Sequence, residues 1–232
     1  AGHPISHSVT PKLFSIVGGA MGLVQAEQIF VEASSEREFH SKVEMLSGDL
    51  WLSCTAPLKH SPHSRLGVQG PVGVNAINQL MRANGVWKGA STDGTGFVSA
   101  CRHIGVEPSS SILRMRGGGS TARSIAAAWS SEGGSIIPEI GRRKLVRGPW
   151  ESRILESGNA DISIDLDSAP AGGQSVELES DMQVSISYNE SSSKGDFAII
   201  MLAAQHLEAW HSLFASKYEK NIPSLEEVLA RL

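Results

Sequence analysis

The chain is poor in cysteine and offers little to bind a metal. Cys54 and Cys101 are its two cysteines among 232 residues, and they form no C-x-x-C pattern. Because two cysteines are too few for a disulfide framework, we expect a reducing compartment, the cytoplasm. His60 and His63 form a close pair, but a structural zinc ion needs four ligands, so we predict a polar loop there and no metal site.

Long apolar runs and basic tracts are also missing. No stretch reaches the ~18 uninterrupted apolar residues of a membrane span, and the first residues show no basic region followed by an apolar one. The 20 Lys and Arg residues are outnumbered by 24 Asp and Glu residues, which gives a formal charge of -4. Proteins that bind nucleic acids neutralise phosphates with clustered Lys and Arg. The sequence therefore predicts neither a membrane protein nor a nucleic-acid-binding protein.

The chain does contain enough apolar sequence for a core, since 41% of its residues are hydrophobic. Residues 28–33 and 49–54 have the pattern of buried strands, and Ser35 with Glu38 forms a capping box that opens a helix between them. Strand–helix–strand units usually build a parallel sheet with helices on its faces. We therefore expect an α/β fold.

Turn signals divide the rest of the chain. Asn84-Gly85 separates residues 77–82 from residues 86–88, which is a strong signal for a tight hairpin. A second α/β region follows, in which an apolar run leads into three glycines and then a helix that ends at Gly133-Gly134. Further strands are expected at residues 135–140, 161–166 and 182–188, and helical segments at residues 150–156, 196–214 and 224–232, the last opened by a capping box of Ser224 and Glu227.

The first candidate for ligand binding is the segment G-H-P-I-S-H-S-V-T-P at residues 2–11. Thr10 is a good helix N-cap, and Pro11 suits the first helical position. The start of such a helix points free N–H groups and the hydroxyls of Ser8 and Thr10 at one spot, which suits a carboxylate or a phosphate. The alternative is that Thr10 merely caps the helix.

Lys59 and Asp93 are candidates for proton transfer. Lys59 follows a buried strand, where open parallel sheets present their ligand-binding loops. A Lys there, paired with an acid from elsewhere in the chain, can relay a proton. Asp93, directly after the hairpin, is the candidate acid. Each residue also has a simpler explanation, since a lone Lys is usually solvated and Asp93 would also suit the cap of the following helix.

A glycine-rich turn between a strand and a helix predicts a dinucleotide site. Residues 117–122 have the pattern G-x-G-x-x-A, which permits a tight turn, close approach to a pyrophosphate, and close packing of helix on strand. A second strand, about 20 residues on, ends at the basic turn Gly141-Arg142-Arg143-Lys144, and Arg at this position favours NADP. Glu139 supports the opposite choice, NAD.

Several of these segments, taken in order, resemble the shikimate dehydrogenase family. Residues 2–11 are similar to its G-x-P-I-x-H-S-x-[ST]-P, residues 55–59 (T-A-P-L-K) to its T-x-P-x-K, and residues 73–76 (G-V-N-A) to its G-A-x-N-T. Residues 92–97 (T-D-G-T-G-F) resemble its T-D-G-x-G-F, residues 117–123 its G-A-G-G-A-x-R loop, and residues 201–205 (M-L-A-A-Q) its M-L-x-x-Q. Each motif is common alone, but all of them in sequence order are highly specific.

The resemblance implies two domains and a reduction. A substrate domain would comprise residues 1–98 and 197–232, and a Rossmann-like NADP domain residues 99–196, with the active site in the cleft. The implied activity is the reversible, NADPH-dependent reduction of 3-dehydroshikimate to shikimate in aromatic amino-acid biosynthesis. Lys59 and Asp93 would be the proton-handling pair of that reaction.

The resemblance also implies roles for the other candidates. Ser8 and Thr10 would hold the ring carboxylate of the substrate. The remaining substrate-binding residues would be Thr55, Asn75, Tyr188 and Gln205. The residues that would bind the cofactor are Gly117, Gly118, Gly119, Ser120, Thr121 and Ala122 at the pyrophosphate, and Arg142 with Arg143 at the 2′-phosphate.

The chain departs from the family pattern at several places. The family has a strand before its G-x-P-I segment, whereas here Ala1 directly precedes that segment, and Ile200 stands where a Gly is usual. Arg114 and Arg116 interrupt a strand expected to be apolar, and because unpaired buried charges are costly we expect them to flank its end. Two alternatives stay open: a quinate or shikimate dehydrogenase that uses NAD, and a relative that binds ligands without turnover.

Overall fold

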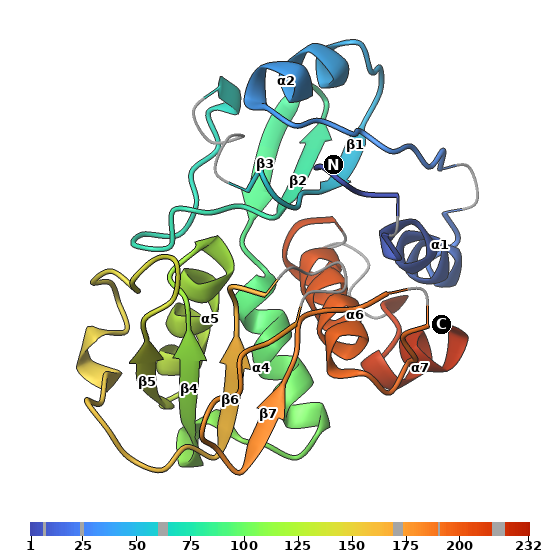
Figure 1. Cartoon of the computed structure of the whole chain (residues 1–232). Helices are drawn as coiled ribbons and strands as arrows, with labels where there is room; N and C mark the ends of the chain where they lie inside the picture. The colour runs from blue at the N-terminus through green and yellow to red at the C-terminus, as the bar shows by residue number, and fades with distance from the viewer. Residues whose placement is uncertain (7, 24–25, 60–64, 169–173, 190, 215–220) are drawn as a thin grey trace. The chain divides into compact units, whose positions relative to one another are not determined.

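A computed structural model describes residues 1–6, 8–23, 26–59, 65–168, 174–189, 191–214 and 221–232, and it divides the chain into two compact units (Figure 1). Unit 1 comprises Ala1–Pro71, Asn75–Thr92 and His206–Leu232, and unit 2 comprises Val72–Val74 and Asp93–Gln205. The division falls after Thr92 and after Gln205, where the sequence suggested residues 98 and 196. Helix α4 (Asp93–His103) therefore lies wholly in unit 2.

Unit 1 contains an antiparallel sheet of three strands in the order β1 (Leu50–Ser53), β2 (Gln79–Ala83) and β3 (Val86–Ala90). The predicted hairpin is confirmed, because Asn84 and Gly85 connect β2 to β3 with φ angles of 49° and 76°. Positive φ at both central residues is what a two-residue turn of this kind requires. The turn forces β2 and β3 to run antiparallel.

The parallel strand–helix–strand unit expected over residues 28–54 was wrong in part. Helix α2 (Glu36–Glu44) forms with Ser35 as its N-cap, and β1 follows it, but β1 pairs with β2. Among the described residues, 28–33 contribute one isolated bridge, from Glu32 to Gly2. Ile29 and Phe30 remain 44% and 54% exposed. A strand needs a neighbouring backbone for its N–H and C=O groups, and the bonds of this segment go to Gly2.

The helices of unit 1 pack around an apolar core. They are α1 (Thr10–Ala20), α2, a π-helical turn η3 (Trp210–Phe214) that continues α6 (Phe197–Ala209), and α7 (Leu225–Arg231). The predicted capping box of Ser224 and Glu227 opens α7 with both hydrogen bonds present. The core under the sheet includes Phe39, Leu58, Ile77 and Leu80, all fully buried.

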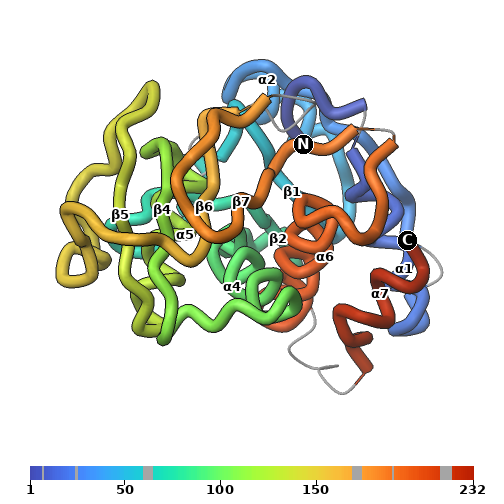
Figure 2. The backbone as a smooth tube through the Cα atoms, turned by 60° about the horizontal axis from the view of Figure 1, so that its bottom comes forward, coloured from blue at the N-terminus to red at the C-terminus, as the bar shows by residue number. Residues whose placement is uncertain are grey.

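Unit 2 confirms the α/β class. Its parallel sheet has the order β5 (Ser135–Glu139), β4 (Ile112–Arg116), β6 (Ile162–Asp165), β7 (Met182–Val184), an order that is clear in Figures 1 and 2. Because β5 lies on one side of β4 and β6 on the other, the loops after β4 and β6 meet at a topological switch point, where open α/β sheets bind ligands.

The helix predicted over residues 150–156 was wrong. A 3-10 turn, η2 (Glu151–Arg153), stands there, and a second, η1 (Pro108–Ser110), precedes β4.

The two arginines of β4 lie within the strand, not beyond its end as expected. Leu113 and Met115 are fully buried on one face, and the arginines point to the other. Arg114 Nη1 lies 2.6 Å from Glu139 Oε1, and Arg116 Nη1 lies 3.1 Å from Asp165 Oδ1. Pairing offsets the cost of their partial burial. The ion pair with Arg114 also occupies Glu139, the residue whose position in the sequence favoured NAD as the cofactor.

Candidate functional site

Backbone hydrogen bonds hold the first residues of unit 1 against the loop after β1. Ala1 O accepts a bond of 2.9 Å from Thr55 N, and Ala56 O accepts one of 3.0 Å from His3 N. Gly2 lies between these bonds at φ 146°, and a Cβ there would come within 2.4 Å of Thr55 Cγ2. The chain passes this close because residue 2 is a glycine. Two motifs far apart in the sequence are thereby brought together.

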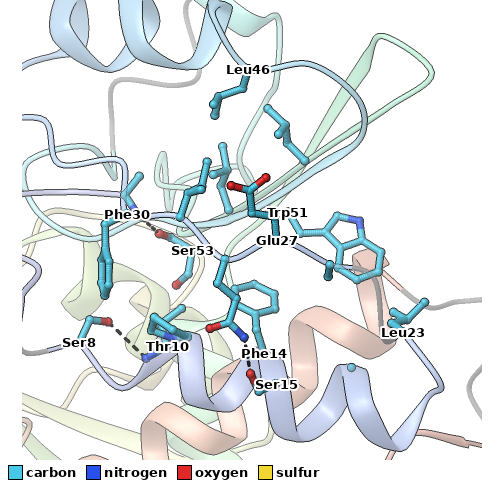
Figure 3. A pocket seen from close by; sticks show the side chains of 18 of the residues that line it. Ser8, Thr10, Phe14, Ser15, Leu23, Glu27, Phe30, Leu46, Trp51 and Ser53 are labelled. Carbon is cyan, nitrogen blue, oxygen red and sulfur yellow. Dashed lines mark hydrogen bonds between the residues drawn. The ribbon is translucent and has the colours of Figure 1, made fainter.

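Ser8 and Thr10 lie side by side, but Thr10 is not the N-cap that the sequence predicted. Helix α1 begins at Thr10, Val9 occupies the cap position, and Ser8 Oγ accepts a bond of 3.3 Å from Thr10 N (Figure 3). Thr10 Oγ1 is instead 3.2 Å from Nε2 of His206, a fully buried residue. A partner from the distant end of the chain therefore fixes the hydroxyl, which local sequence rules do not anticipate.

A cavity of about 710 Å³ in unit 1 brings three of the predicted substrate residues together. Ser8, Thr10 and Thr55 line it, with Phe30 and Trp51 among the aromatic groups on its walls (Figure 3). Hydroxyls and backbone N–H groups on an apolar wall suit a small polar ligand.

Lys59 and Asn75 are not among the residues that line this cavity. Lys59 is half-buried, and its carbonyl accepts a bond of 2.9 Å from Ile77 N. Asn75 is exposed and has a positive φ of 49°, which Asn tolerates better than most residues. Asn78, which the sequence analysis did not single out, accepts a bond of 2.6 Å from Thr92 N and so fixes the residue before Asp93.

In unit 2, Asp93 is held beside the glycine turn. It is 4% exposed, it is the first residue of α4, and its Oδ2 accepts a bond of 2.9 Å from Thr121 Oγ1 in α5 (Ser120–Ser131). Gly94 N donates to Ser124 Oγ at 2.9 Å. The candidate acid and the candidate cofactor helix are therefore joined by side-chain bonds, which the sequence did not predict.

Gln205 and Tyr188 also belong to unit 2. Helix α4 runs beside α6 in Figures 1 and 2, and a Cβ on Gly96 would lie 2.5 Å from Gln205 Cβ. Gly96 thus lets the turn of α6 that carries Gln205 pack against the start of α4. Tyr188 follows β7, and burial raises the pKa of its phenol, which keeps it a hydrogen-bond donor at neutral pH.

The glycine turn has the backbone that the sequence predicted. Gly117 follows β4 at φ 108°, and a Cβ on Gly118 would lie 2.2 Å from Lys144 O. Gly119 is the N-cap of α5 and has no side chain to cap the helix, and a Cβ built on Gly119 would meet nothing within 4 Å. Ser120, Thr121 and Ala122 form the first turn of the helix. Open space beside the glycine at a helix start fits a phosphate group.

Basic side chains gather near this turn. Arg142 and Arg143 are exposed on the loop after β5, as predicted. Arg123 Nε donates to Val74 O at 2.7 Å, and both burial and the charge of Arg143 lower the pKa of Arg123. The charge of Arg143 therefore acts close to Arg123, at the helix that follows the glycine turn.

Two expectations concerned absences. Within the described ranges, no three His, Cys, Asp or Glu side chains come close enough to hold a metal ion, and the pair His60 and His63 lies outside those ranges. No helix among the described residues is long and apolar enough to cross a membrane.

No protein-family profile matches the chain. Named shikimate dehydrogenases (NADP(+)) do match: the protein from Xylella fastidiosa strain Temecula1 is 31% identical over 136 residues, and that from Xanthomonas campestris pv. campestris strain B100 is 32% identical over 143 residues. Each match covers 57% of this chain and 48% of the relative. The chain thus matches about half the length of these curated relatives.

Solved structures share the fold over nearly the whole chain. Shikimate 5-dehydrogenase from Thermus thermophilus, in complex with NADP(H) and shikimate, superposes with a TM-score of 0.76 at 19% identity, covering 99% of this chain and 95% of that one. The enzyme from Aquifex aeolicus gives a TM-score of 0.74 at 18% identity, with coverage of 99% and 94%. The chain is thus similar in sequence to named shikimate dehydrogenases over about half their length, and it shares the fold of solved shikimate dehydrogenases.

Proposed function

We propose that the protein is an NADP-dependent shikimate dehydrogenase that reversibly reduces 3-dehydroshikimate to shikimate. The observation that carries the proposal is the hydrogen bond from Thr121 to Asp93. It ties the buried carboxylate of Asp93, in α4, to the first turn of α5, the helix that follows the glycine turn. A proton-handling group and a phosphate-binding turn are thereby built into one unit. The names of the matched relatives agree with this activity.

The residues of the glycine turn fit a dinucleotide. Gly118 admits the close approach of the loop, and the space at Gly119, at the start of α5, receives the pyrophosphate. Arg142 and Arg143 supply positive charge for the 2′-phosphate. When bound, NADPH supplies the hydride that reduces the ketone.

The side chains of the protein then bind the substrate and move the proton. Ser8 and Thr10 hold its carboxylate from the cavity of unit 1, Thr55, Asn75 and Gln205 bond to its ring hydroxyls, and Tyr188 lies near the substrate. Reduction of a ketone creates an alkoxide, which an ammonium group both stabilises and protonates. Lys59 Nζ has that role: as an ammonium it gives its proton to the alkoxide, and in the reverse reaction the neutral amine takes that proton from the hydroxyl. The carboxylate of Asp93 stabilises the ammonium form.

The first prediction concerns Lys59→Ala, assayed with 3-dehydroshikimate and NADPH. A general acid is typically worth about 10²- to 10⁴-fold, so we expect kcat to fall by at least about 100-fold while KM changes little. Lys88→Ala, which removes an exposed lysine of β3 in the same unit, is the matched control and should retain wild-type kcat.

An unchanged kcat in Lys59→Ala contradicts the assignment of Lys59. Two further outcomes would replace the proposal itself. Faster turnover with NADH than with NADPH would indicate the NAD-using alternative, and binding of shikimate without any turnover would indicate a non-catalytic relative.

A further inference from the structure

Asp167 lies at the switch point of the sheet in unit 2, two residues after the end of β6. Its side chain is 9% exposed. A Cβ on Gly117 would lie 3.1 Å from Asp167 Oδ1, and one on Gly141 would lie 1.9 Å from Oδ2. The carboxylate therefore fills space that two glycines leave free, one on the glycine turn and one on the basic turn. Contacts with both glycines restrict the carboxylate of Asp167 to this space.

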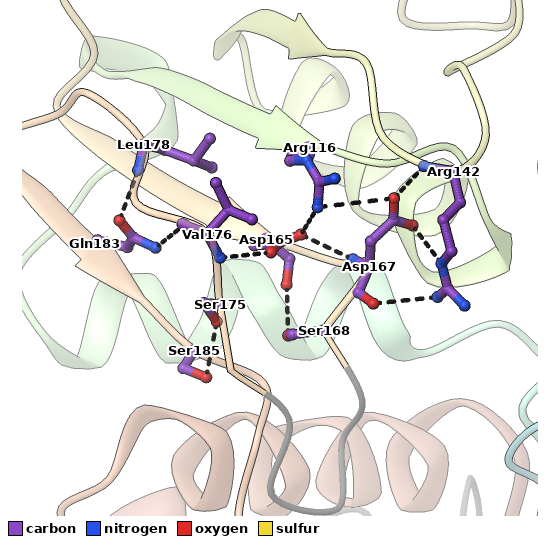
Figure 4. Close-up of polar contacts among 10 residues, drawn as sticks. All are labelled: Arg116, Arg142, Asp165, Asp167, Ser168, Ser175, Val176, Leu178, Gln183 and Ser185. Carbon is purple, nitrogen blue, oxygen red and sulfur yellow. Dashed lines mark hydrogen bonds and ion pairs between the residues drawn. The ribbon is translucent and has the colours of Figure 1, made fainter.

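Arg142 is the main partner of this carboxylate. Its backbone N–H donates to Asp167 Oδ2, its Nε lies 3.6 Å from Oδ1, and its Nη2 donates to the carbonyl oxygen of Asp167 at 3.1 Å (Figure 4). Asp167 thus takes both the main-chain donor and the guanidinium of the arginine. These are the donors that an incoming phosphate would use.

A second carboxylate, Asp165, binds Arg116, so that Arg142 is the closer cationic partner of Asp167. Burial favours the neutral form of Asp165, but bonds from Val176 N, Asp167 N and Arg116 outweigh it and lower its pKa. Arg116 is 3.1 Å from Asp165 Oδ1 and 3.9 Å from Asp167 Oδ2, so Asp165 is its closer partner (Figure 4). Arg142 therefore carries the tighter contacts to Asp167.

We propose that Asp167 is a specificity-determining residue that competes with the 2′-phosphate of the cofactor for Arg142. The inference rests on the proposed function, because it assumes that the glycine turn binds a dinucleotide. A 2′-phosphate placed at Arg142 would meet the negative charge of Asp167, whereas a 2′-hydroxyl would not. Asp167 lowers the affinity for NADP relative to NAD, and so reduces the preference for NADP that Arg142 and Arg143 create.

The test measures binding alone, by calorimetry, with 2′,5′-ADP and 5′-AMP as probes that differ by the 2′-phosphate. For Asp167→Asn we expect 2′,5′-ADP to bind at least about tenfold more tightly, the scale of removing a like charge a few ångströms away near a protein surface. The affinity for 5′-AMP should stay within about twofold. Asp181→Asn removes the same charge from an exposed site at the opposite end of the strands, before β7, and should change neither affinity.

A second substitution separates competition from a structural effect. Arg142→Ala in the Asp167→Asn background should remove the gain in affinity for 2′,5′-ADP. Should Asp167→Asn melt below the assay temperature, Asp167→Ser, which also removes the charge, is measured in its place.

Unchanged or weaker binding of 2′,5′-ADP by these variants would overturn the proposal, and would show that Asp167 orients Arg142 for the phosphate. That result leaves the proposed function standing, since the wild type would still bind the probe. Failure of every folded form, including the wild type, to bind either probe would overturn the dinucleotide site itself and the inference with it.

Discussion

His206 shows how one buried side chain controls a candidate ligand group. Its Nε2 lies 3.2 Å from Thr10 Oγ1, and among the described residues its Nδ1 has no hydrogen-bond partner. Burial lowers the pKa of His206 to about 4, so its ring is neutral at pH 7. A neutral ring beside Thr10 adds no positive charge to the cavity. A carboxylate bound there would gain no ion pair from His206.

The same shift makes stability depend on pH. Because the pKa of His206 is depressed on folding from about 6.5 to about 4, only the unfolded chain binds a proton between these values. Above about pH 6.5, the pKa of His206 in the unfolded chain, this group costs no stability. As the pH falls from about 6.5 to about 4, the free energy of unfolding decreases. Between pH 7 and pH 5 the loss should be about 2 kcal/mol, measured by urea unfolding at each pH.

His206→Gln removes the titrating ring and should remove that part of the pH dependence. His211→Gln, which alters an exposed histidine of the same segment, serves as the control and should keep it. A slope between pH 7 and pH 5 that is the same in wild type and His206→Gln would exclude His206 as its source.

Helix α4 packs closely on α5, and Gly94 makes this contact possible. A Cβ on Gly94 would lie 2.0 Å from the carbonyl oxygen of Ser124, which is backbone and cannot rotate away. The contact is what brings Asp93 within 2.9 Å of Thr121. Helix separation and the geometry of the candidate acid therefore depend on the same glycine.

Gly94→Ala should destabilise the protein by about 3 kcal/mol, at the upper end for overpacking, because the two helices must move apart. Urea unfolding measures the loss, and kcat should fall with it because Asp93 moves away from Thr121. Gly19→Ala is the matched control: Gly19 is in α1, and a Cβ there meets nothing within 4 Å. It should raise stability by about 0.5–1 kcal/mol through helix propensity. Equal stability of the two variants would contradict the packing argument.

At the scale of the whole molecule, the chain has two compact units with different candidate ligands. The glycine turn and the basic turn are both in unit 2, whereas the cavity with Ser8, Thr10 and Thr55 is in unit 1. Binding of the cofactor should therefore register first in unit 2. Hydrogen exchange resolves the two units within one sample.

We expect NADP⁺, added without substrate, to slow exchange at residues 117–123 and 141–145. The hairpin of β2 and β3 in unit 1 should exchange at its unliganded rate, because none of its residues is assigned to the cofactor. A slowing confined to the hairpin, or none anywhere at saturating NADP⁺, would contradict the assignment of the cofactor site.

Tertiary contacts decided several features that local sequence did not indicate. Residues 28–33 have the apolar pattern of a strand, but pairing depends on a neighbouring backbone, and theirs is limited to Gly2. Thr10 has the chemistry of a cap, yet His206, 196 positions away, binds its hydroxyl. The role of Asp167 depends on space left by Gly117 and Gly141, which are distant in the chain.

The sequence by itself determined the features that depend on neighbouring residues. These are the turn at Asn84-Gly85, the box of Ser224 and Glu227, and the glycine turn that opens α5, because each is set by local φ angles or by bonds across three residues. The tertiary structure alone decided which strands pair, which acid meets Thr121 and which carboxylate meets Arg142. Such contacts join segments far apart in the chain, and their geometry exists only once the core has packed.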